Sequence, residues 1–250
     1  HQKLDMEYTG YRYSGCPISD EEMEYIKNDV YVLREVLEFM FDQGHKSLTI
    51  GSCCMYEYRG TLCSDEFKMN FPDLTKITLE ECYESSTADE YIRKSYRGGW
   101  CYVVPEKTNK VFRNGVTADV NSLYPSMMHS ESGNYYPVGA PVFWKGNYIP
   151  EKAMNKTKRY YFIRFKCSFR IKPNYLPFIQ IKGNPLYKAT EMLTDSRPSL
   201  GGVKYDSITV DGVEHTNIVT MTMTCTDWEL FNKHYYINDL QILDGCYFYS

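Results

Sequence analysis

One stretch near the middle of the chain constrains the fold, because it prescribes a strand, a turn and a helix in that order. The β-branched run 115–120 predicts a short buried strand, which places the carboxylate of Asp119 at the strand's carboxyl end. Pro125 has no N–H and disfavours helical geometry at the residue before it, so we expect the next helix to begin at Pro125 or Ser126. Residues 121–124 must then form the turn.

This turn also predicts a binding chemistry. The N–H groups of residues 121–125 would lack helical partners, and the Asp119 carboxylate would lie beside them. Proteins hold a phosphate chain and its Mg²⁺ in this way, with the N–H groups on the anion and the carboxylate on the metal. The alternative is a buried, capped turn with a structural aspartate.

The overall composition is that of a globular protein. The chain has 250 residues, 43% of them apolar, which suffices for one large core or two smaller ones. No apolar run approaches the roughly 18 residues of a membrane span, and no secretory pattern opens the chain, so we expect a cytoplasmic protein with no membrane partner. The nine cysteines form no Cys-x-x-Cys pair, which favours reduced thiols. Because the chain starts at His1 and its first helix cap is Ser19, we expect a piece of a longer protein.

Charge is distributed unevenly, although the net charge is only −4. Residues 1–90 hold 19 acids and 8 bases, whereas residues 152–188 hold ten bases and no acid. Aromatic residues are interleaved with these bases, as expected for phosphate contacts combined with stacking on unpaired nucleotide bases. The alternative is a pair of strands with aromatic residues inward and a solvated basic face. The bases are Lys152, Lys156, Lys158, Arg159, Arg164, Lys166, Arg170, Lys172, Lys182 and Lys188, and the aromatics are Tyr160, Tyr161, Phe162, Phe165, Phe169, Tyr175, Phe178 and Tyr187.

Hydrophobic spacing and turn residues predict helices in the first half of the chain and mostly strands in the second. Ser19 and Glu22 form a capping box, so we expect a helix from there toward Gly44. Asp211-Gly212 between two strand patterns predicts a hairpin turn. We expect further helices at residues 48–58, 64–70, 79–94, 125–132 and 226–235. We expect strands at residues 100–104, 115–120, 141–144, 160–171, 176–181, 207–210, 217–222 and 239–249.

Two other short motifs combine residues suited to chemistry. Tyr25 and Asp29 stand four residues apart, so they lie one turn from each other on one helix face. In the sequence Tyr-Arg-Gly-Gly at 96–99, the tyrosine and arginine can bind phosphates. The two glycines that follow allow another backbone to approach closely. The alternatives are a structural pair in the first motif and an ordinary turn into the next strand in the second.

The segment 119–126, Asp-Val-Asn-Ser-Leu-Tyr-Pro-Ser, resembles the first catalytic palm motif of family B DNA polymerases. The resemblance implies that Asp119, with the backbone of Val120, helps to hold the two Mg²⁺ ions of nucleotidyl transfer, for which Mn²⁺ can substitute. It implies that Tyr124 lies under the sugar of the incoming nucleotide and excludes a 2′-hydroxyl. The implied nucleotide-binding residues are Val120, Asn121, Ser122, Leu123 and Tyr124.

Residues 25–29, Tyr-Ile-Lys-Asn-Asp, look like the third motif of the 3′–5′ exonuclease that precedes the palm in this family. The likeness implies that Asp29 binds a metal ion and that the Tyr25 hydroxyl orients the attacking water. Residues 3–8, Lys-Leu-Asp-Met-Glu-Tyr, are similar to a segment of the protein-primed branch. This implies that Lys3 assists exonuclease chemistry and that Tyr8 binds DNA. The family's other exonuclease carboxylates have no counterpart here.

The tetrapeptide at 96–99 resembles the Tyr-x-Gly-Gly element that joins exonuclease to palm and holds the template strand. Residues 131–235 occupy the place of an insertion that contacts the priming protein and the DNA in the protein-primed branch. Together with the basic pattern, the resemblance implies a further set of DNA-binding residues. They are Tyr96, Arg97, Gly98, Gly99, Lys156, Lys158, Arg159 and Lys182.

The resemblance implies an α+β chain from a protein-primed, phage-type family B DNA polymerase. We expect residues 1–58 to end a 3′–5′ exonuclease domain, 59–130 to hold linker helices and the start of the palm, 131–235 to form a strand-rich insertion, and 236–250 to return to the palm. The family's Lys-x-x-x-Asn-Ser-x-Tyr-Gly and Asp-Thr-Asp motifs are absent from the chain. Because a two-metal site needs both aspartates, we expect the isolated chain to be inactive.

We expect the parent to be a DNA-directed DNA polymerase in the cytoplasm of a bacterial host, encoded by a phage or a mobile element. Its expected partners are primer-template and single-stranded DNA, deoxynucleoside triphosphates and a priming terminal protein. The alternative is a stand-alone, palm-derived module that binds single-stranded DNA or a protein partner without catalysis.

Overall fold

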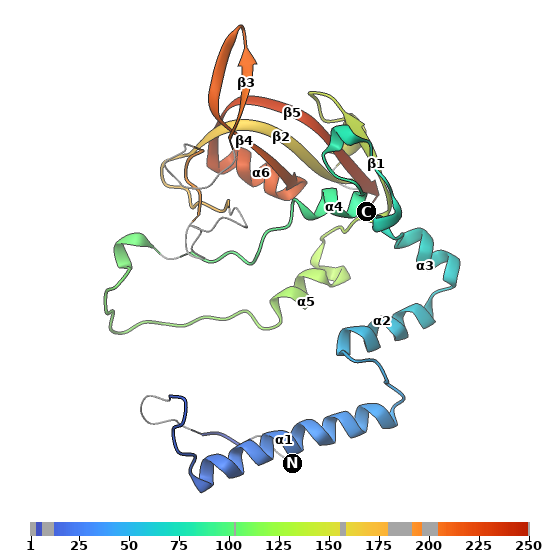
Figure 1. Ribbon diagram of the computed structural model, residues 1–250, viewed down its shortest axis with the longest axis vertical. Helices are drawn as coiled ribbons and strands as arrows, with labels where there is room; N and C mark the ends of the chain where they lie inside the picture. The colour runs from blue at the N-terminus through green and yellow to red at the C-terminus, as the bar shows by residue number, and fades with distance from the viewer. Residues whose placement is uncertain are drawn as a thin grey trace. The chain divides into compact units, whose positions relative to one another are not determined.

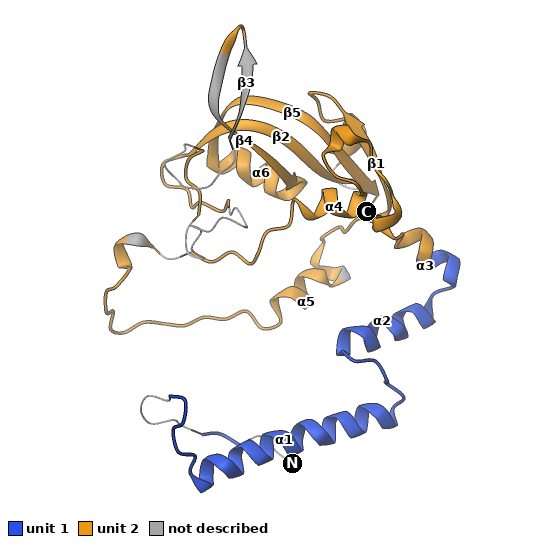
Figure 2. Ribbon diagram, in the orientation of Figure 1, with its two compact units in different colours: residues 1–67 blue, residues 68–250 orange. Residues whose placement is uncertain are grey.

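The computed structural model describes residues 4–6, 13–102, 104–155, 159–179, 192–196 and 205–249. The chain divides into two compact units, residues 1–67 and residues 68–250 (Figure 2). Helices are the regular structure in the described part of the first unit, whereas the second unit is built around a sheet. The prediction of an α+β fold is therefore confirmed.

The first unit contains helix α1 (Asp20–Asp42), helix α2 (Ile50–Thr61) and the start of helix α3 (Ser64–Asn70). The predicted capping box is confirmed, because the Glu22 N–H donates to the Ser19 hydroxyl and the Ser19 N–H donates to the Glu22 carboxylate. No residue of α1 is buried, and Val30 and Leu33 keep 59% and 60% of their surfaces exposed. The apolar spacing thus predicts the helix correctly, although its apolar stripe is uncovered.

The second unit is organised around one five-stranded antiparallel sheet with the strand order β1-β5-β2-β4-β3 (Figure 1). Its strands are β1 (Val138–Lys145), β2 (Arg159–Ile171), β3 (Tyr205–Val210), β4 (Val213–Thr224) and β5 (Tyr235–Tyr249). In the pairing of the two longest strands, Arg164 of β2 stands directly opposite Asp244 of β5. The predicted hairpin turn is confirmed, because Asp211 and Gly212 connect β3 to β4 with left-handed φ angles of 50° and 79°.

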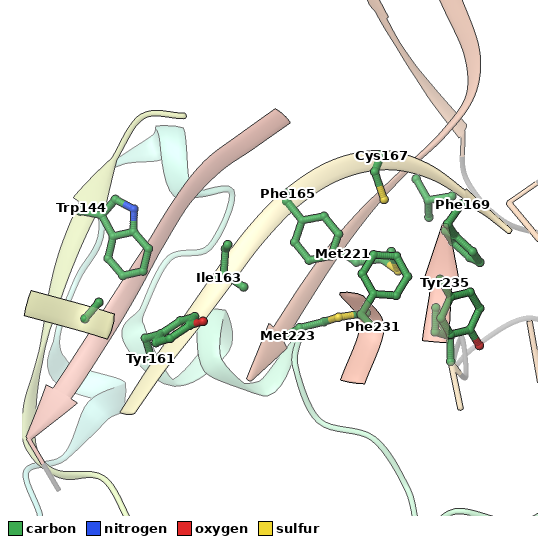
Figure 3. Packing of buried hydrophobic residues seen from close by; sticks show 13 residues of the cluster. Trp144, Tyr161, Ile163, Phe165, Cys167, Phe169, Met221, Met223, Phe231 and Tyr235 are labelled. Carbon is green, nitrogen blue, oxygen red and sulfur yellow. The ribbon is translucent and has the colours of Figure 1, made fainter. Parts of the chain in front are cut away.

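One face of the sheet forms the main hydrophobic core with helix α6 (Cys225–His234). Alternate residues of β2 reach this core, as the two-residue period of a strand requires. These residues are Tyr161, Ile163, Phe165, Cys167 and Phe169. The fully buried ring of Phe231 from α6 lies 5.7 Å from the Phe165 ring and 5.5 Å from the Phe169 ring, measured between centroids (Figure 3). Aromatic burial therefore holds α6 against the sheet.

The opposite face of the sheet packs against a segment that contains the short helix α4 (Ala88–Arg93). Phe162 of β2 and Phe248 of β5 lie in a second buried cluster with Tyr83 and Tyr91. Because Phe162 and Arg164 alternate with the core residues of β2, the two faces of this strand carry different partners.

The connection between β1 and β5 is tightest at Gly245, which pairs with Trp144. A Cβ atom at position 245 would lie 2.2 Å from the Trp144 ring and 2.5 Å from the Phe162 carbonyl oxygen. No side chain fits there without displacing its neighbours, so glycine leaves room for the indole of Trp144 beside β5.

The remaining described helical pieces of the second unit are short. They are the 3₁₀ turns η1 (Leu74–Lys76), η2 (Glu81–Tyr83), η3 (Pro105–Lys107), η4 (Ser130–Ser132) and η5 (Glu151–Met154), and helix α5 (Leu123–Met128). The helix predicted at 79–94 is divided, because Glu84 takes a left-handed φ of 50° after η2 and Thr87 caps α4 afresh. Within the ranges that the structure describes, no helix is both long and apolar enough to cross a bilayer.

Three predicted strands are wrong in the described residues. Residues 115–120 have no regular structure, and neither do the described parts of 100–104. In 176–181 the described residues form only an isolated bridge between Ile179 and Leu193. A strand needs the backbone of a neighbouring strand, and none of β1 to β5 pairs with these segments. Their β-branched composition is therefore not sufficient.

Candidate nucleotide and nucleic-acid site

The predicted turn before Pro125 exists, but helix α5 begins at Leu123, two residues earlier than predicted. Ser122 precedes it with φ 50° and ψ 45°, and its carbonyl oxygen accepts a hydrogen bond of 2.9 Å from the Ser126 N–H. Proline fits the first helical turn because N–H groups there have no intrahelical acceptor. Tyr124 therefore takes helical geometry, although the proline that follows it disfavours this geometry.

The palm-motif residues lie at the surface rather than in a buried strand. Val120 is 60% exposed, Leu123 is 47% exposed and Tyr124 is 69% exposed, and Asp119 is exposed as well. A Cβ atom built on Gly99 would lie 3.6 Å from the Tyr124 hydroxyl oxygen. The structure therefore brings the Tyr-Arg-Gly-Gly element beside the predicted palm motif, although Tyr124 lies 25 positions after Gly99 in the chain.

A metal ion would need more ligands than Asp119 offers by itself. Across the ranges that the structure describes, no group of three or more Asp, Glu, His and Cys side chains is placed to hold a metal. One carboxylate and a backbone carbonyl leave most positions around Mg²⁺ to water or to a phosphate. The described residues therefore do not form a two-metal site by themselves.

The Arg97 guanidinium is held by backbone carbonyl groups. Its Nη2 donates to the Thr222 oxygen at 3.0 Å, and its Nη1 donates to the Lys94 oxygen at 3.1 Å. Burial lowers the pKa of Arg97 from its ordinary value, against the opposing effect of the Asp227 charge. This arrangement joins the Tyr-Arg-Gly-Gly element to strand β4, and Tyr96 remains 68% exposed.

A buried polar cluster fixes α4, the helix that leads into this element. The Tyr91 hydroxyl donates to Asp244 Oδ1 at 2.7 Å, and the Arg164 Nε donates to the same oxygen at 3.0 Å. Arg164 Nη2 donates to Cys82 O at 2.7 Å, and Nη1 lies 2.7 Å from Glu84 Oε2 as an ion pair without hydrogen-bond geometry. Burial and the Asp244 charge both raise the pKa of Tyr91, so its hydroxyl keeps its proton.

This cluster corrects the prediction that the bases of residues 152–188 contact nucleic acid. Arg164 is only 3% exposed, and its charge is matched by Asp244, so it is not available to a nucleic acid. Lys172 donates through Nζ to the carbonyl oxygens of Asn232 and Lys233, which are at the end of α6. A cation there satisfies helix carbonyls and opposes the negative end of the helix dipole.

The predicted stacking of bases on the aromatics of this segment is wrong for β2. Tyr161, Phe162, Phe165 and Phe169 are all less than 9% exposed, because they form the two cores of the sheet. Tyr175 remains on the surface at 40% exposure. The alternation of aromatic and polar residues along β2 was the signal for this burial.

A hollow of about 360 Å³ lies beside the Tyr-Arg-Gly-Gly element. Most of its charged lining is cationic, and Glu84 is the acid among the lining residues. The cations are Arg93, Lys94, Arg97 and Arg164. Sequence reasoning found Arg97 but missed Arg93 and Lys94, because their contribution depends on how α4 is packed.

The other predicted site residues fall into three groups. Tyr25 and Asp29 are on α1 and are partly buried, and their four-residue spacing is helical as predicted. The side chain of Arg159 lies outside the described residues, although its backbone begins β2. Lys3, Tyr8, Lys156, Lys158 and Lys182 lie outside the described residues altogether.

Known proteins resemble the chain along its whole length. A family model described as DNA polymerase type B, organellar and viral, matches residues 2–250. A DNA polymerase of Bacillus phage Nf is 34% identical over 245 residues, which make up 97% of this chain and 36% of that protein. Phi29 DNA polymerase complexed with primer-template DNA is 29% identical, with a TM-score of 0.65 and coverage of 99% of this chain and 37% of the other. Its complex with primer-template DNA and incoming nucleotide substrates has a TM-score of 0.62 at 29% identity and the same coverage. The chain thus spans little more than a third of the length of these relatives.

Proposed function

Because the chain belongs to the organellar and viral type B DNA polymerases, we propose that it is part of a protein-primed, DNA-directed DNA polymerase. The observation that carries this proposal is the family match over residues 2–250, which includes the Asp119 motif. The share of the relatives that the chain covers supports a larger parent protein. In that parent, residues 1–58 would end the exonuclease domain, 59–130 would start the palm, 131–235 would form the insertion, and 236–250 would return to the palm.

Asp119, together with the carbonyl group of Val120, is proposed as a ligand of Mg²⁺ in the parent. The bound metal would neutralise charge on the triphosphate during nucleotidyl transfer. The turn 120–124 would contribute the free N–H groups at the start of α5 to phosphate oxygens. Tyr124, exposed and beside Gly99, would present its ring to the sugar of the nucleotide.

The Tyr-Arg-Gly-Gly element is proposed to hold the template strand. Arg93 and Lys94, which are exposed and line the hollow beside Arg97, support contact with phosphate oxygens, and exposed Tyr96 can stack on a base. Because Arg97 is bound to the Thr222 and Lys94 carbonyl groups, we assign it to orienting the element, with its charge as a longer-range attraction. Gly98 and Gly99 would allow the strand to approach the backbone.

The remaining roles follow from family membership. Asp29 would bind a metal ion and Tyr25 would orient water in the exonuclease, assisted by Lys3, with Tyr8 on the DNA. The insertion would contact a priming terminal protein, with Lys156, Lys158, Arg159 and Lys182 on DNA phosphates. Such a polymerase would act in the cytoplasm of an infected bacterium.

The test uses the complete protein encoded by the reading frame that contains this chain. With primer-template DNA, deoxynucleotides and Mg²⁺, we expect primer extension by the parent and its loss by orders of magnitude in Asp119→Asn. The matched control is Glu131→Gln, which neutralises an exposed acid eight residues after Leu123. The control variant should extend primers normally. Normal extension by Asp119→Asn would contradict the proposed role.

A second candidate is favoured by the single carboxylate of the motif and by the cation-lined hollow. The chain would then bind single-stranded DNA without catalysis. Binding through phosphates should weaken steeply as salt rises, and neutralising Lys156, Lys158 and Arg159 should reduce the slope. A flat response to salt would exclude this function.

A further inference from the structure

The Tyr-Arg-Gly-Gly element is anchored by a side chain on each side of its glycine pair. Before the pair, the Arg97 guanidinium donates to the Thr222 carbonyl oxygen of β4 at 3.0 Å. After the pair, the indole Nε1 of Trp100 donates to the Pro177 carbonyl oxygen, also at 3.0 Å. The glycines at 98–99 belong to no helix or strand. Because no ladder of backbone hydrogen bonds holds them, their position depends on the two flanking side chains.

The acceptor of the indole hydrogen bond lies in a loop that is itself held in place. The N–H of Phe178 donates to the Tyr235 hydroxyl at 3.1 Å, and Tyr235 is 1% exposed. The Leu176 carbonyl oxygen lies 2.9 Å from His234 Nδ1. Both neighbours of Pro177 are therefore fixed to the end of α6 and the start of β5. An acceptor in a fixed position loses little conformational entropy when it receives a hydrogen bond.

Packing holds this part of the element only weakly. A hollow of about 390 Å³ is lined by Gly98 and Trp100 of the element and by Leu176 and Pro177 of the loop. Trp100 is 53% exposed, and its ring stacks on Tyr102 with the ring centroids 5.7 Å apart. Because side chains do not fill the space between element and loop, the hydrogen bond from Trp100 contributes more to holding them together than packing does.

The position of the glycine pair matters because Gly99 lies close to Tyr124, whose hydroxyl oxygen would be 3.6 Å from a Cβ atom built on the glycine. With the roles proposed above, a shift of the pair would move the template strand relative to the nucleotide, and catalysis is sensitive to such shifts. We propose that Trp100 is a positioning residue, whose N–H on the Pro177 carbonyl group holds the glycines at 98–99 beside Tyr124 and so sets where the template strand lies. The inference rests on the proposed template role of the element.

Two substitutions of Trp100 separate its N–H group from its ring. Trp100→Phe keeps an aromatic ring without a donor. Trp100→His keeps a donor, because His Nε2 has the same place in its five-membered ring as indole Nε1 has. Trp144→Phe is the matched control, because it removes an indole hydrogen bond of 2.8 Å to the Tyr148 carbonyl oxygen elsewhere in the same unit. Circular dichroism verifies that each variant folds.

The first measurement uses the isotope-labelled 250-residue chain and does not depend on any activity. The NMR order parameters of the Gly98 and Gly99 amides should fall from about 0.85 toward about 0.6 in Trp100→Phe. They should stay near the values of the unsubstituted chain in Trp100→His and in Trp144→Phe. Unchanged order parameters in Trp100→Phe, an equal fall in Trp144→Phe, or values below about 0.6 already in the unsubstituted chain would overturn the proposal.

The second measurement uses the complete protein encoded by the reading frame, with primer-template DNA, deoxynucleotides and Mg²⁺. Loss of one hydrogen bond in Trp100→Phe should raise the KM for primer-template about fivefold and change kcat by less than about twofold. Trp100→His should restore this KM to within about twofold, and Trp144→Phe should leave it unchanged, which a general loss of stability would not do.

The two measurements distinguish failure of this proposal from failure of the proposed function. If the unsubstituted protein extends primers and Trp100→Phe has an unchanged KM for primer-template, the role of Trp100 in placing the template strand is refuted. If the unsubstituted protein does not extend primers, the proposed function fails and the template role fails with it. The order parameters then still decide whether Trp100 holds the glycine pair.

Discussion

Removing the charge of Arg164 should destabilise the second unit far more than removing an exposed arginine. Arg164 and Asp244 are each 3% exposed and face each other across β2 and β5, so Arg164→Met leaves a buried carboxylate without its cation. Breaking such a pair costs about 3–5 kcal/mol. Glu84 adds no such penalty, because its side chain is 66% exposed and is solvated when the arginine is lost.

A second substitution, added to Arg164→Met, tests this reasoning because it should restore stability rather than reduce it further. Asp244→Asn removes the stranded charge and keeps an acceptor for the Tyr91 hydroxyl, so the double variant should be at least about 1 kcal/mol more stable than Arg164→Met. Arg93→Met is the matched control, because Arg93 pairs with Asp89 at the surface and its loss should leave the unfolding midpoint nearly unchanged.

Urea unfolding followed by tryptophan fluorescence measures these differences, because Trp100, Trp144 and Trp228 all belong to the second unit. With a slope of about 2 kcal/mol per molar urea, a loss of 3 kcal/mol lowers the midpoint by about 1.5 M. A midpoint for Arg164→Met that matches Arg93→Met, or a further loss in the double variant, would refute the account of this cluster.

Three other outcomes follow from the packing and the pKa shifts. Gly245→Ala should destabilise the second unit by about 1–3 kcal/mol, measured by the same urea titration, because its methyl group would clash with the Trp144 ring. Gly115→Ala in the same unit has open space around the added methyl group and should not destabilise. Iodoacetamide should modify the exposed thiols in the folded chain but not Cys167 and Cys246, because burial raises the pKa of both thiols. Mass spectrometry of the labelled native and unfolded chains tests this. Labelling of Cys167 or Cys246 in the native chain would contradict it. Burial raises the pKa of the Asp227 carboxyl, so the folded state holds this proton more tightly than the unfolded state; its stabilising contribution is complete at low pH and is lost as pH rises from about 4 through the folded pKa. Thermal unfolding over this pH range should show the unsubstituted chain losing stability relative to Asp227→Asn as pH rises. Parallel plots of melting temperature against pH for the two chains would contradict the raised pKa of Asp227.

Local signals in the sequence predicted local structure well. The capping pattern at Ser19 and the Asp211-Gly212 turn act through neighbouring residues, so their outcome does not depend on the rest of the fold. The helix at Cys225–His234 was predicted for the same reason, apart from its ends. The long strands of the sheet were predicted from their hydrophobic pattern, and they form because each has a neighbouring strand to pair with.

The failures involve partners that are distant in the chain. The strand at 115–120 was predicted from β-branched residues, but a strand forms only beside another strand. Arg164 was counted among the bases for DNA because its partner, Asp244, is 80 residues away. Arg93 and Lys94 were missed for another reason, because their place beside Arg97 depends on how α4 packs against the sheet. For the palm motif, the sequence predicted the turn before Pro125. It did not predict that Gly99 lies next to Tyr124, because the spacing of residues along the chain does not indicate this contact.

The opposed positions of Arg164 and Asp244 also determine how β2 and β5 can be aligned. These strands contain two irregularities in their pairing, and many of their side chains are aromatic, so hydrophobicity alone discriminates weakly among alignments. A slip of β2 by one residue would turn Arg164 toward the core beside Phe231 and would expose Ile163 to the opposite face. An unmatched guanidinium in that core would cost several kcal/mol, so the charge pair excludes the wrong alignment during folding. The buried pair thus favours the correct register of β2 and β5 over the register shifted by one residue.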